Sequence, residues 1–385
     1  MGKVDICPAC GEPYPVHDGP ICRGCQGEAP YEFSPGQEDS RPNVRSVPVQ
    51  EAVGQRTAHD MTRIVPGENK DAEFNAGQTL AAGDVCRLQQ MGRNTVYVQD
   101  QADELGDWVH EDQAALEFAR AMAGPGVEYD SRPKEGKINF RAARQGLFVL
   151  DQELLRAFNL QPRVVCASRQ NRLVVEEGKI LAGTRAIPLY LEKAEHARAL
   201  RILGSGTLLQ VLQLRRPKTG ILVTGTEVFT GLIQDRFIPV IKAKVENFSG
   251  EVVGTDIVPD QAEAIQEGLG KLLRAGADLV ITTAGLSVDP EDVTRQGLLR
   301  AGLEQECFGL PVLPGAMTLC GRIGSAQVLG VPACALYYKT TSLDLILPQL
   351  LAGLQPTSQE LAAMGEGGLC LGCRSCTYPK CPFGK

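Results

Sequence analysis

The chain has 385 residues, of which 43% are hydrophobic and 22% charged, and its formal net charge at pH 7 is −7. Such a length is enough for two or three domains that each bury a core. The acidic balance argues against a broad surface for nucleic-acid phosphates, so we expect no nucleic-acid partner. The first residues lack the charged start and apolar core of a signal peptide, and no apolar run reaches the roughly 18 residues that a membrane span needs. We therefore expect a cytoplasmic protein with no membrane partner.

The chain begins with a cysteine-rich module, predicted over residues 1–30 and followed by a polar linker over residues 31–46. Its spacing, C-x2-C-x11-C-x2-C, is typical of a zinc ribbon, in which four thiolates hold Zn²⁺ at ~2.3 Å. In so short a segment the metal supplies the folding energy. The predicted zinc ligands are Cys7, Cys10, Cys22 and Cys25.

Two further domains are predicted before the C-terminal half. Residues 47–135 have a mixed α+β pattern, with a helix over 82–91 and a strand over 95–98. An amphipathic helix is predicted over 110–124, because acids occupy its first turn and a glycine follows its last. Residues 136–216 are predicted as a β-rich domain, with strand signals such as KINFRAA, GLFVL and RVVCAS.

From residue 217 to 354 apolar strands alternate with amphipathic helices. This alternation predicts an α/β domain with a parallel sheet covered by helices on both faces. Ligands of such sheets bind at the carboxyl ends of the strands. The expected strands cover residues 220–227, 251–260, 277–285 and 326–332, and the expected helices cover 235–250, 260–277, 292–302 and 340–353.

Polar turns follow these strands at the edge where a ligand is expected. The backbone N–H groups of Gly225 and Gly285, with the hydroxyls of Thr226 and Ser287, could cradle a phosphate. Acidic residues lie beside these turns, and carboxylates near a phosphate suit a Mg²⁺ ion bound between them. The alternative is that the same acids cap helices or lie in solvated turns. These acids are Glu227, Asp235, Asp289 and Asp292.

A second cysteine group lies in the tail predicted over residues 355–385. Its spacing, C-x2-C-x2-C-x4-C-P, differs by one residue from the bacterial ferredoxin run C-x2-C-x2-C-x3-C-P. Three interpretations stay open: a Zn²⁺ site, a [4Fe–4S] cluster, or a redox-active or unliganded thiol group. The cysteines are Cys370, Cys373, Cys376 and Cys381.

The stretches VTGTEV, DIVPD, TTAGLSVDPEDVT, LPGAM and VPAC, between Ile221 and Gly353, carry a resemblance to a known family. They resemble the molybdopterin-binding domain of molybdenum-cofactor biosynthesis proteins. With the HED helix and the ending YPKCPFGK, the longer chain resembles a bacterial branch related to the molybdopterin molybdenumtransferases. The resemblance implies that the protein binds molybdopterin or its adenylylated form, and that it inserts molybdate with the help of Mg²⁺. It also implies a homodimer.

Site residues follow from position in these motifs. The resemblance implies that Asp235, Asp292 and Glu227 hold Mg²⁺ and act in catalysis. The residues implied in binding the cofactor are Thr224, Gly225, Thr226, Thr283, Gly285, Ser287, Pro314, Gly315 and Pro332.

The chain departs from the family pattern at three places. Ala284 and Ala333 stand where the family has glycine, and the stretch Leu313–Met317 lacks the family's lysine. A methyl group at a position with positive φ costs ~1 kcal/mol of backbone strain. These departures favour the alternative of a non-catalytic carrier or sensor that docks on a molybdoenzyme client through its metal modules, or of a scaffold without activity. The retained acids favour an enzyme.

Overall fold

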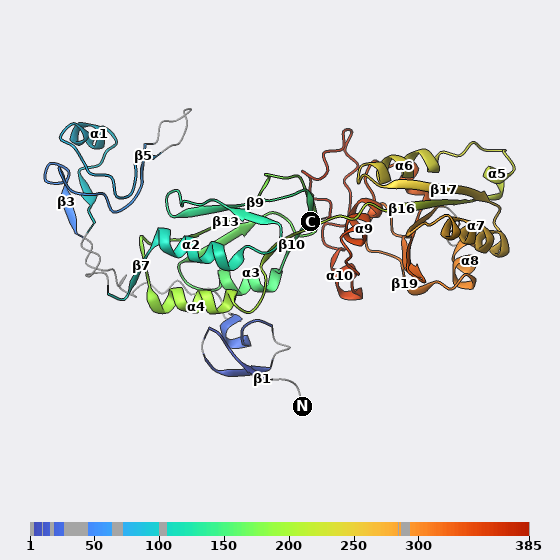
Figure 1. The fold of residues 1–385 in the computed structure, drawn as a ribbon, viewed down its shortest axis with the longest axis horizontal. Coiled ribbons are helices and arrows are strands. Elements are labelled where there is room, and N and C mark those ends of the chain that lie inside the picture. The colour runs from blue at the N-terminus through green and yellow to red at the C-terminus, as the bar shows by residue number, and fades with distance from the viewer. Residues whose placement is uncertain are drawn as a thin grey trace. The chain divides into compact units, whose positions relative to one another are not determined.

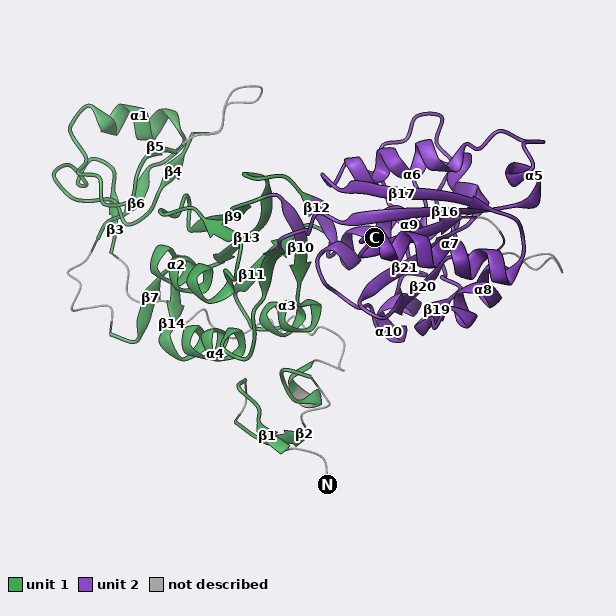
Figure 2. Ribbon diagram, turned by 45° about the vertical axis from the view of Figure 1, so that its right-hand side comes forward, with its two compact units in different colours: residues 1–144, 148–169, 175–211 green, residues 145–147, 170–174, 212–385 purple. Residues whose placement is uncertain are grey.

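The computed structural model describes residues 4–9, 11–15, 19–26, 45–63, 72–99, 106–283, 285 and 293–384. The chain divides into two compact units, coloured separately in Figure 2. Unit 1 comprises residues 1–144, 148–169 and 175–211, and unit 2 comprises residues 145–147, 170–174 and 212–385. Within the described ranges, no helix is both long enough and apolar enough to cross a membrane.

The N-terminal part of unit 1 is built from short elements. The first hairpin pairs β1 (Val4–Ile6) with β2 (Pro13–Pro15), and the 3-10 helix η2 (Arg23–Gln26) follows. The next segment has its own apolar cluster, which includes Phe74 and Leu88, both fully buried. Its elements are β3 (Ser46–Pro48), β4 (Met61–Thr62), β5 (Ala72–Phe74), α1 (Asp84–Gln90) and β6 (Thr95–Tyr97).

The segment from residue 106 to 212 combines helices and strands. Helix α2 (Glu111–Met122) matches the predicted amphipathic helix, and the side chain of His110 accepts a hydrogen bond from the backbone N–H of Asp112 at its start. Two helices lie in the stretch predicted to be β-rich: α3 (Gln152–Asn159) and α4 (Lys193–Leu203). The strands are β7 (Trp108–His110), β8 (Val127–Tyr129), β9 (Lys137–Ala142), β10 (Gly146–Leu150), β11 (Val164–Ser168), β12 (Leu173–Val175), β13 (Ile180–Ala186), β14 (Tyr190–Glu192) and β15 (Leu209–Leu212).

Unit 2 is organised around a six-stranded sheet with the order β17-β16-β18-β21-β20-β19. The first four strands are parallel, as predicted, but β20 pairs antiparallel with both β21 and β19. The prediction of a purely parallel sheet is therefore wrong at this edge. The strands are β16 (Lys218–Thr224), β17 (Glu251–Val258), β18 (Leu279–Thr283), β19 (Glu304–Phe308), β20 (Leu319–Ile323) and β21 (Ala326–Val331).

Helices cover both faces of this sheet (Figure 1). Successive side chains of a strand point to opposite faces, so Ile221 packs in one apolar cluster and Leu222 in the other. The first cluster joins α6 (Phe237–Glu246) and α9 (Ser342–Leu351), and the second joins α7 (Ala262–Arg274) and α8 (Thr294–Arg300). A short helix, α5 (Thr226–Phe229), follows β16 directly.

The C-terminal tail folds onto the first of these clusters. Helix α10 (Ser358–Ala363) starts with a capping box formed by Thr357 and Glu360. Beyond the helix the chain has little regular structure, but Phe383 packs in the cluster with only 3% of its surface exposed.

Candidate functional site

The carboxyl ends of three parallel strands lie level with one another in unit 2. Thr283, at the end of β18, is in register with Val223 of β16 and with Val331 of β21. Residues that follow these strands therefore share one edge of the sheet. The structure thus brings together the turns after Thr224, Thr283 and Val331, which belong to three of the five stretches singled out in the sequence, VTGTEV, TTAGLSVDPEDVT and VPAC.

Buried hydroxyl groups tie two of these turns together. The Thr224 hydroxyl, which is 1% exposed, donates a hydrogen bond to the Thr283 carbonyl oxygen at 3.0 Å. It also lies 2.8 Å from the hydroxyl of Thr294, the first residue of α8. Thr294, the last residue of the stretch TTAGLSVDPEDVT, was not among the predicted site residues, and the stretch by itself does not predict its contact with a residue 70 positions away. Thr224 therefore fixes the turn rather than reaching out to a ligand.

Two of these turns contain glycines in conformations that other residues rarely adopt. Gly225 has a φ of +148° and Gly285 a φ of +59°, a region that L side chains rarely adopt. A Cβ on Gly285 would overlap the Thr294 hydroxyl and come within 3.1 Å of the Thr224 hydroxyl. Gly225 is buried and its backbone N–H donates a hydrogen bond to the Val258 carbonyl oxygen at 3.1 Å, while the threonine hydroxyls fill the Cβ position of Gly285, so both turns need glycine for their own packing.

Asp260 completes the first turn and was missed as a site residue. Its Oδ2 atom accepts hydrogen bonds from the Thr226 backbone N–H at 2.7 Å and the Thr226 hydroxyl at 3.1 Å. The sequence makes Asp260 a plausible cap of the following helix, but Gln261 occupies the N-cap position of α7, and Asp260 instead accepts hydrogen bonds at the start of α5. Its carboxylate adds negative charge beside Gly225.

The predicted catalytic acids have different positions. Asp235 lies at the start of α6, where its two oxygens accept hydrogen bonds from the backbone N–H groups of Phe237 and Ile238, at 2.9 and 3.1 Å. This is the helix-capping role that the sequence left open as an alternative. Glu227 is exposed in the first turn of α5.

The loop between β18 and α8 lies mostly outside the described residues. Of the predicted site residues, Ser287 and Asp292 fall in this undescribed part, and so does Ala284, one of the departures from the family pattern. Their predicted roles stay predictions.

The stretch LPGAM, which contains Pro314 and Gly315, packs against the start of α9. The Leu313–Pro314 peptide bond is cis, and Gly315 has a φ of +122°. A Cβ on Gly315 would overlap the side chain of Ser342, whose hydroxyl lies 2.6 Å from that of Thr318. This loop thus needs glycine for packing inside the protein, whatever it binds.

The stretch VPAC contains Pro332, which precedes the 3-10 helix η4 (Ala333–Leu336). A 3-10 helix has negative φ angles, so the methyl group of Ala333 carries no strain of the kind considered for a left-handed position.

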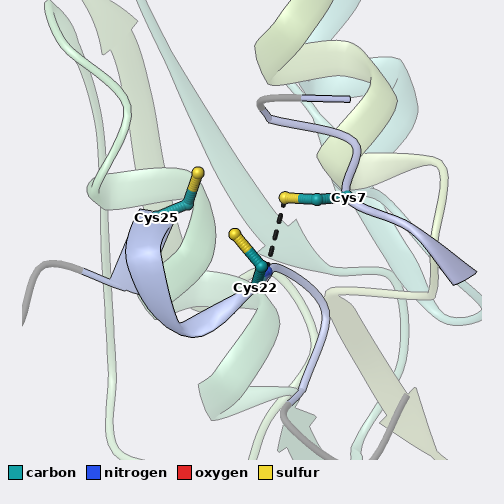
Figure 3. Close-up of side chains that lie close together, drawn as sticks. All are labelled: Cys7, Cys22 and Cys25. Carbon is teal, nitrogen blue, oxygen red and sulfur yellow. Dashed lines mark hydrogen bonds between the residues drawn. The ribbon is translucent and has the colours of Figure 1, made fainter. Parts of the chain in front are cut away.

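Three of the four N-terminal cysteines form a compact group (Figure 3). The sulfur atoms of Cys7, Cys22 and Cys25 all lie within 4.8 Å of one another, and the Cys22 backbone N–H donates to Cys7 Sγ at 3.3 Å. Cys10, the predicted fourth ligand, lies outside the described residues. Three thiols at this separation fit a tetrahedral Zn²⁺ ion.

The four C-terminal cysteines line one cavity of about 370 Å³. Cys376 is exposed and lies beside Thr340. A hydrogen bond with the Thr340 hydroxyl, at 3.2 Å, and a further one with the backbone of Tyr378 lower the pKa of its thiol.

Three stretches of the chain match known protein families. Residues 220–352 match the family described as "Probable molybdopterin binding domain", and residues 1–32 match the FmdE treble clef zinc finger. Residues 46–100 match a family described as a domain of unknown function. The zinc-binding character predicted for the N-terminus is supported, although the matching family is a treble clef and not a ribbon.

Among curated proteins, the chain is similar to the molybdopterin molybdenumtransferase of Haemophilus influenzae, with 30% identity over 168 residues. The match covers 42% of this chain and 41% of that protein. A CinA-like protein of Mycobacterium sp. (strain JLS) is 38% identical over 77 residues, which are 20% of this chain and 18% of that protein. The chain thus spans less than half the length of these curated relatives.

Among solved structures, the molybdopterin biosynthesis enzyme MoaB of Thermus thermophilus is 26% identical, with a TM-score of 0.31. The match covers 36% of this chain and 97% of that one. A molybdenum cofactor biosynthesis protein of Pyrococcus furiosus matches 82% of this chain and 67% of its own, with 15% identity and a TM-score of 0.24.

The class of domain is thereby defined. Unit 2 carries an α/β domain with glycine turns at the carboxyl edge of its parallel strands, and residues 220–352 match the family of probable molybdopterin-binding domains. For this part of the chain, the match confirms the resemblance to molybdopterin-binding domains that the sequence showed.

Proposed function

We propose that the edge formed by the Thr224, Thr283 and Val331 turns binds molybdopterin or its adenylylated form. The observation that supports this proposal is the pair of glycine turns at Gly225 and Gly285, which follow the carboxyl ends of neighbouring parallel strands and are tied together through the Thr224 hydroxyl. Backbone N–H groups at such turns bind anionic oxygens. The predicted binding residues Thr226 and Pro332 belong to two of these turns, and Pro314 and Gly315 of the stretch LPGAM stay further candidates for binding the cofactor.

The proposed reaction is the insertion of molybdate with the help of Mg²⁺, catalysed without a covalent nucleophile. Glu227 is exposed beside Gly225, and Asp260 adds a second carboxylate there. Mg²⁺ prefers oxygen ligands and keeps several waters, so a few carboxylates and a phosphate suffice to hold it. Asp235 and Asp292 stay candidate ligands of the same ion. The similarity to a molybdopterin molybdenumtransferase supports an enzyme.

A second function is a carrier that delivers the bound cofactor to a molybdoenzyme client. The sequence Leu313–Met317 favours it, because this loop supplies no cation for the oxyanion of a transfer reaction. The homodimer implied by the resemblance is compatible with both the enzyme and the carrier.

A binding titration with molybdopterin, with and without Mg²⁺, tests the site directly. The informative variant is Gly225→Ala, because the added Cβ would lie in the turn, 3.1 Å from Glu227 Oε1, and strain a backbone with positive φ. Gly276→Ala is the matched control. Gly276 also has a positive φ, +89°, but lies in the turn before β18, where a Cβ meets nothing within 4 Å.

Both substitutions cost ~1 kcal/mol of backbone strain. We expect Gly225→Ala to weaken binding at least about tenfold, equivalent to ~1.4 kcal/mol, and Gly276→Ala to leave it unchanged. Equal affinities of both variants and the wild type would overturn the proposed site. Binding without turnover of molybdate would favour the carrier over the enzyme.

A further inference from the structure

The C-terminal cysteines have a setting that differs from that of the N-terminal ones. Cys370, Cys373, Cys376 and Cys381 all line the same cavity of about 370 Å³ in unit 2. We propose that this cavity holds a [4Fe–4S] cluster, with these four thiolates as its ligands. The proposal is independent of what the pterin edge binds.

The separation of the sulfur atoms argues against zinc. Four thiolates at ~2.3 Å from a tetrahedral Zn²⁺ lie about 3.8 Å from one another and leave no cavity between them. In the part of the chain that the structure describes, three cysteine sulfurs lie within 4.8 Å of one another only at Cys7, Cys22 and Cys25. The C-terminal cysteines are fully described and are spread more widely around an open space.

The size of the cavity fits a group much larger than one ion. A water molecule takes about 30 Å³ of liquid volume, so about 370 Å³ is far more than a single metal ion needs. A cluster of four irons and four sulfides places its thiolates on the corners of a cube, farther apart than around one zinc. Four cysteines around one cavity match that ligand set.

The tail is also held in place by the protein itself. Cys370 donates its backbone N–H to the Leu313 carbonyl at 2.8 Å, and Gly384 donates to the Gly367 carbonyl at 2.9 Å. Phe383 is 3% exposed in the core of unit 2, and its ring meets that of Tyr378 at an edge-to-face angle of 69°. Small zinc modules, in contrast, depend on their metal to fold. The cavity is therefore a preformed site that is ready to accept a cluster.

The walls of the cavity have the groups that iron–sulfur sites use. The Thr340 hydroxyl lies 3.2 Å from Cys376 Sγ, and hydrogen bonds to ligand sulfurs tune the potential of a cluster. Lys339 and Arg374 line the cavity and can offset the negative charge of four thiolates. The aromatic rings of Tyr378 and Phe383 limit contact with solvent on another side.

The spacing of the cysteines agrees with this assignment. In the bacterial ferredoxin run the first three cysteines, C-x2-C-x2-C, bind one cluster and the fourth binds a second cluster. Here the fourth cysteine, Cys381, lines the same cavity as the first three. We therefore relate the additional residue between Cys376 and Cys381 to a site in which all four cysteines bind the same cluster.

Metal and sulfide analysis of the full chain, purified and reconstituted without oxygen, tests the proposal. The test variant is Cys373→Ser with Cys376→Ser, two residues that are exposed and do not contribute to the core. Cys86→Ser is the matched control, because Cys86 is an exposed cysteine of α1. A third variant, Cys22→Ser, changes the N-terminal group instead.

We expect about four irons and four sulfides per chain, with visible absorption that bleaches on reduction and a paramagnetic signal in the reduced protein. The double variant should lose the iron and sulfide and keep its zinc, while Cys22→Ser should lose zinc and keep iron. Cys86→Ser should retain both, and circular dichroism should show that all variants are folded. The proposal fails if reconstituted protein holds no iron, or if the double variant loses zinc instead of iron.

Discussion

At the scale of single residues, Thr224 and Thr219 offer a controlled comparison, because both are buried threonines on β16. The Thr224 hydroxyl bonds to Thr283 and Thr294, whereas the Thr219 hydroxyl has no hydrogen-bond partner in the described ranges. Removing a buried hydrogen-bonding group that has partners costs about 1–3 kcal/mol, and removing one that has none is close to neutral.

We therefore predict that Thr224→Val lowers the free energy of unfolding of unit 2 by about 1–3 kcal/mol, and that Thr219→Val changes it by less than about 0.5 kcal/mol. Hydrogen exchange of the β16 amides measures both. Thr224→Val should also weaken molybdopterin binding, since the two turns lose their link. Equal effects of the two substitutions on stability would contradict the network.

Glu111 leads to a prediction about pH. Burial raises the pKa of its carboxyl group to about 7. Arg185 opposes this shift, whereas Asp112 and Asp60 make smaller contributions in the same direction as burial. The folded protein thus holds the proton more tightly than the unfolded chain, in which the pKa is 4.5. The proton on Glu111 therefore contributes fully to the free energy of unfolding below pH 4.5. This contribution is lost as the pH rises to about 7.

We expect the free energy of unfolding of unit 1 to fall by up to about 3 kcal/mol over this window because of Glu111. Denaturant titrations between pH 4 and 8 measure this slope. Glu111→Gln should remove it, while Glu177→Gln, which changes an exposed carboxylate of the same unit, should retain it. Parallel slopes in all three proteins would show that Glu111 has an ordinary pKa.

At the scale of elements, Asp235 combines a structural role that is observed with a catalytic role that is proposed. Its carboxylate caps α6. Asparagine caps a helix about as well as aspartate, whereas alanine costs about 1 kcal/mol. The two substitutions therefore separate capping from charge.

We predict that Asp235→Ala lowers the free energy of unfolding of unit 2 by about 1 kcal/mol and that Asp235→Asn leaves it nearly unchanged. If Asp235 is also a Mg²⁺ ligand, Asp235→Asn should weaken Mg²⁺-dependent molybdopterin binding about tenfold, that is, by ~1.4 kcal/mol. Calorimetric titrations at two Mg²⁺ concentrations measure this. Unchanged Mg²⁺ dependence in the Asn variant would leave Asp235 as a helix cap alone.

The elements also show what could be predicted from the sequence. The alternation from β16 to α9 follows from apolar periodicity, and so does the sharing of one edge by the turns after Thr224 and Thr283. Strands β19 and β20 were missed because their residues, EQECF and LCGRI, mix charged and apolar side chains without a clear period. Helices α3 and α4 were missed because strand signals surround them.

The contacts that shape the edge could not be predicted in the same way. Asp260 and Thr226 are 34 positions apart, and Thr224 and Thr294 are 70 apart. Such pairs depend on the register of the folded sheet, which local patterns do not encode. The cysteine spacings, in contrast, predicted the N-terminal zinc module, because ligands of one metal site often lie close together in sequence; the metal at the C-terminal cysteines stays a prediction.

At the scale of the whole molecule, the two cysteine modules stabilise the protein in different ways. In its described residues, the N-terminal module has the short elements β1, β2 and η2, of which the first is exposed. The C-terminal module packs on the core of unit 2 through Phe383 and Cys370. We therefore expect the N-terminal module to need its metal in order to fold. The C-terminal module is expected to fold without a metal and to bind one in its existing cavity.

This difference predicts opposite responses to metal removal. A chelator that takes the zinc, or the Cys22→Ser variant, should abolish the hydrogen-exchange protection of β1 and β2, because a metal of this kind contributes about 10–16 kcal/mol to a small zinc module. Unit 2 should keep its protection, since its sheet and apolar clusters do not include these residues. Cys373→Ser with Cys376→Ser should leave β1 and β2 protected and should lower protection only around residues 368–384. Protection of β1 and β2 that survives zinc removal would show that the N-terminal module folds without its metal.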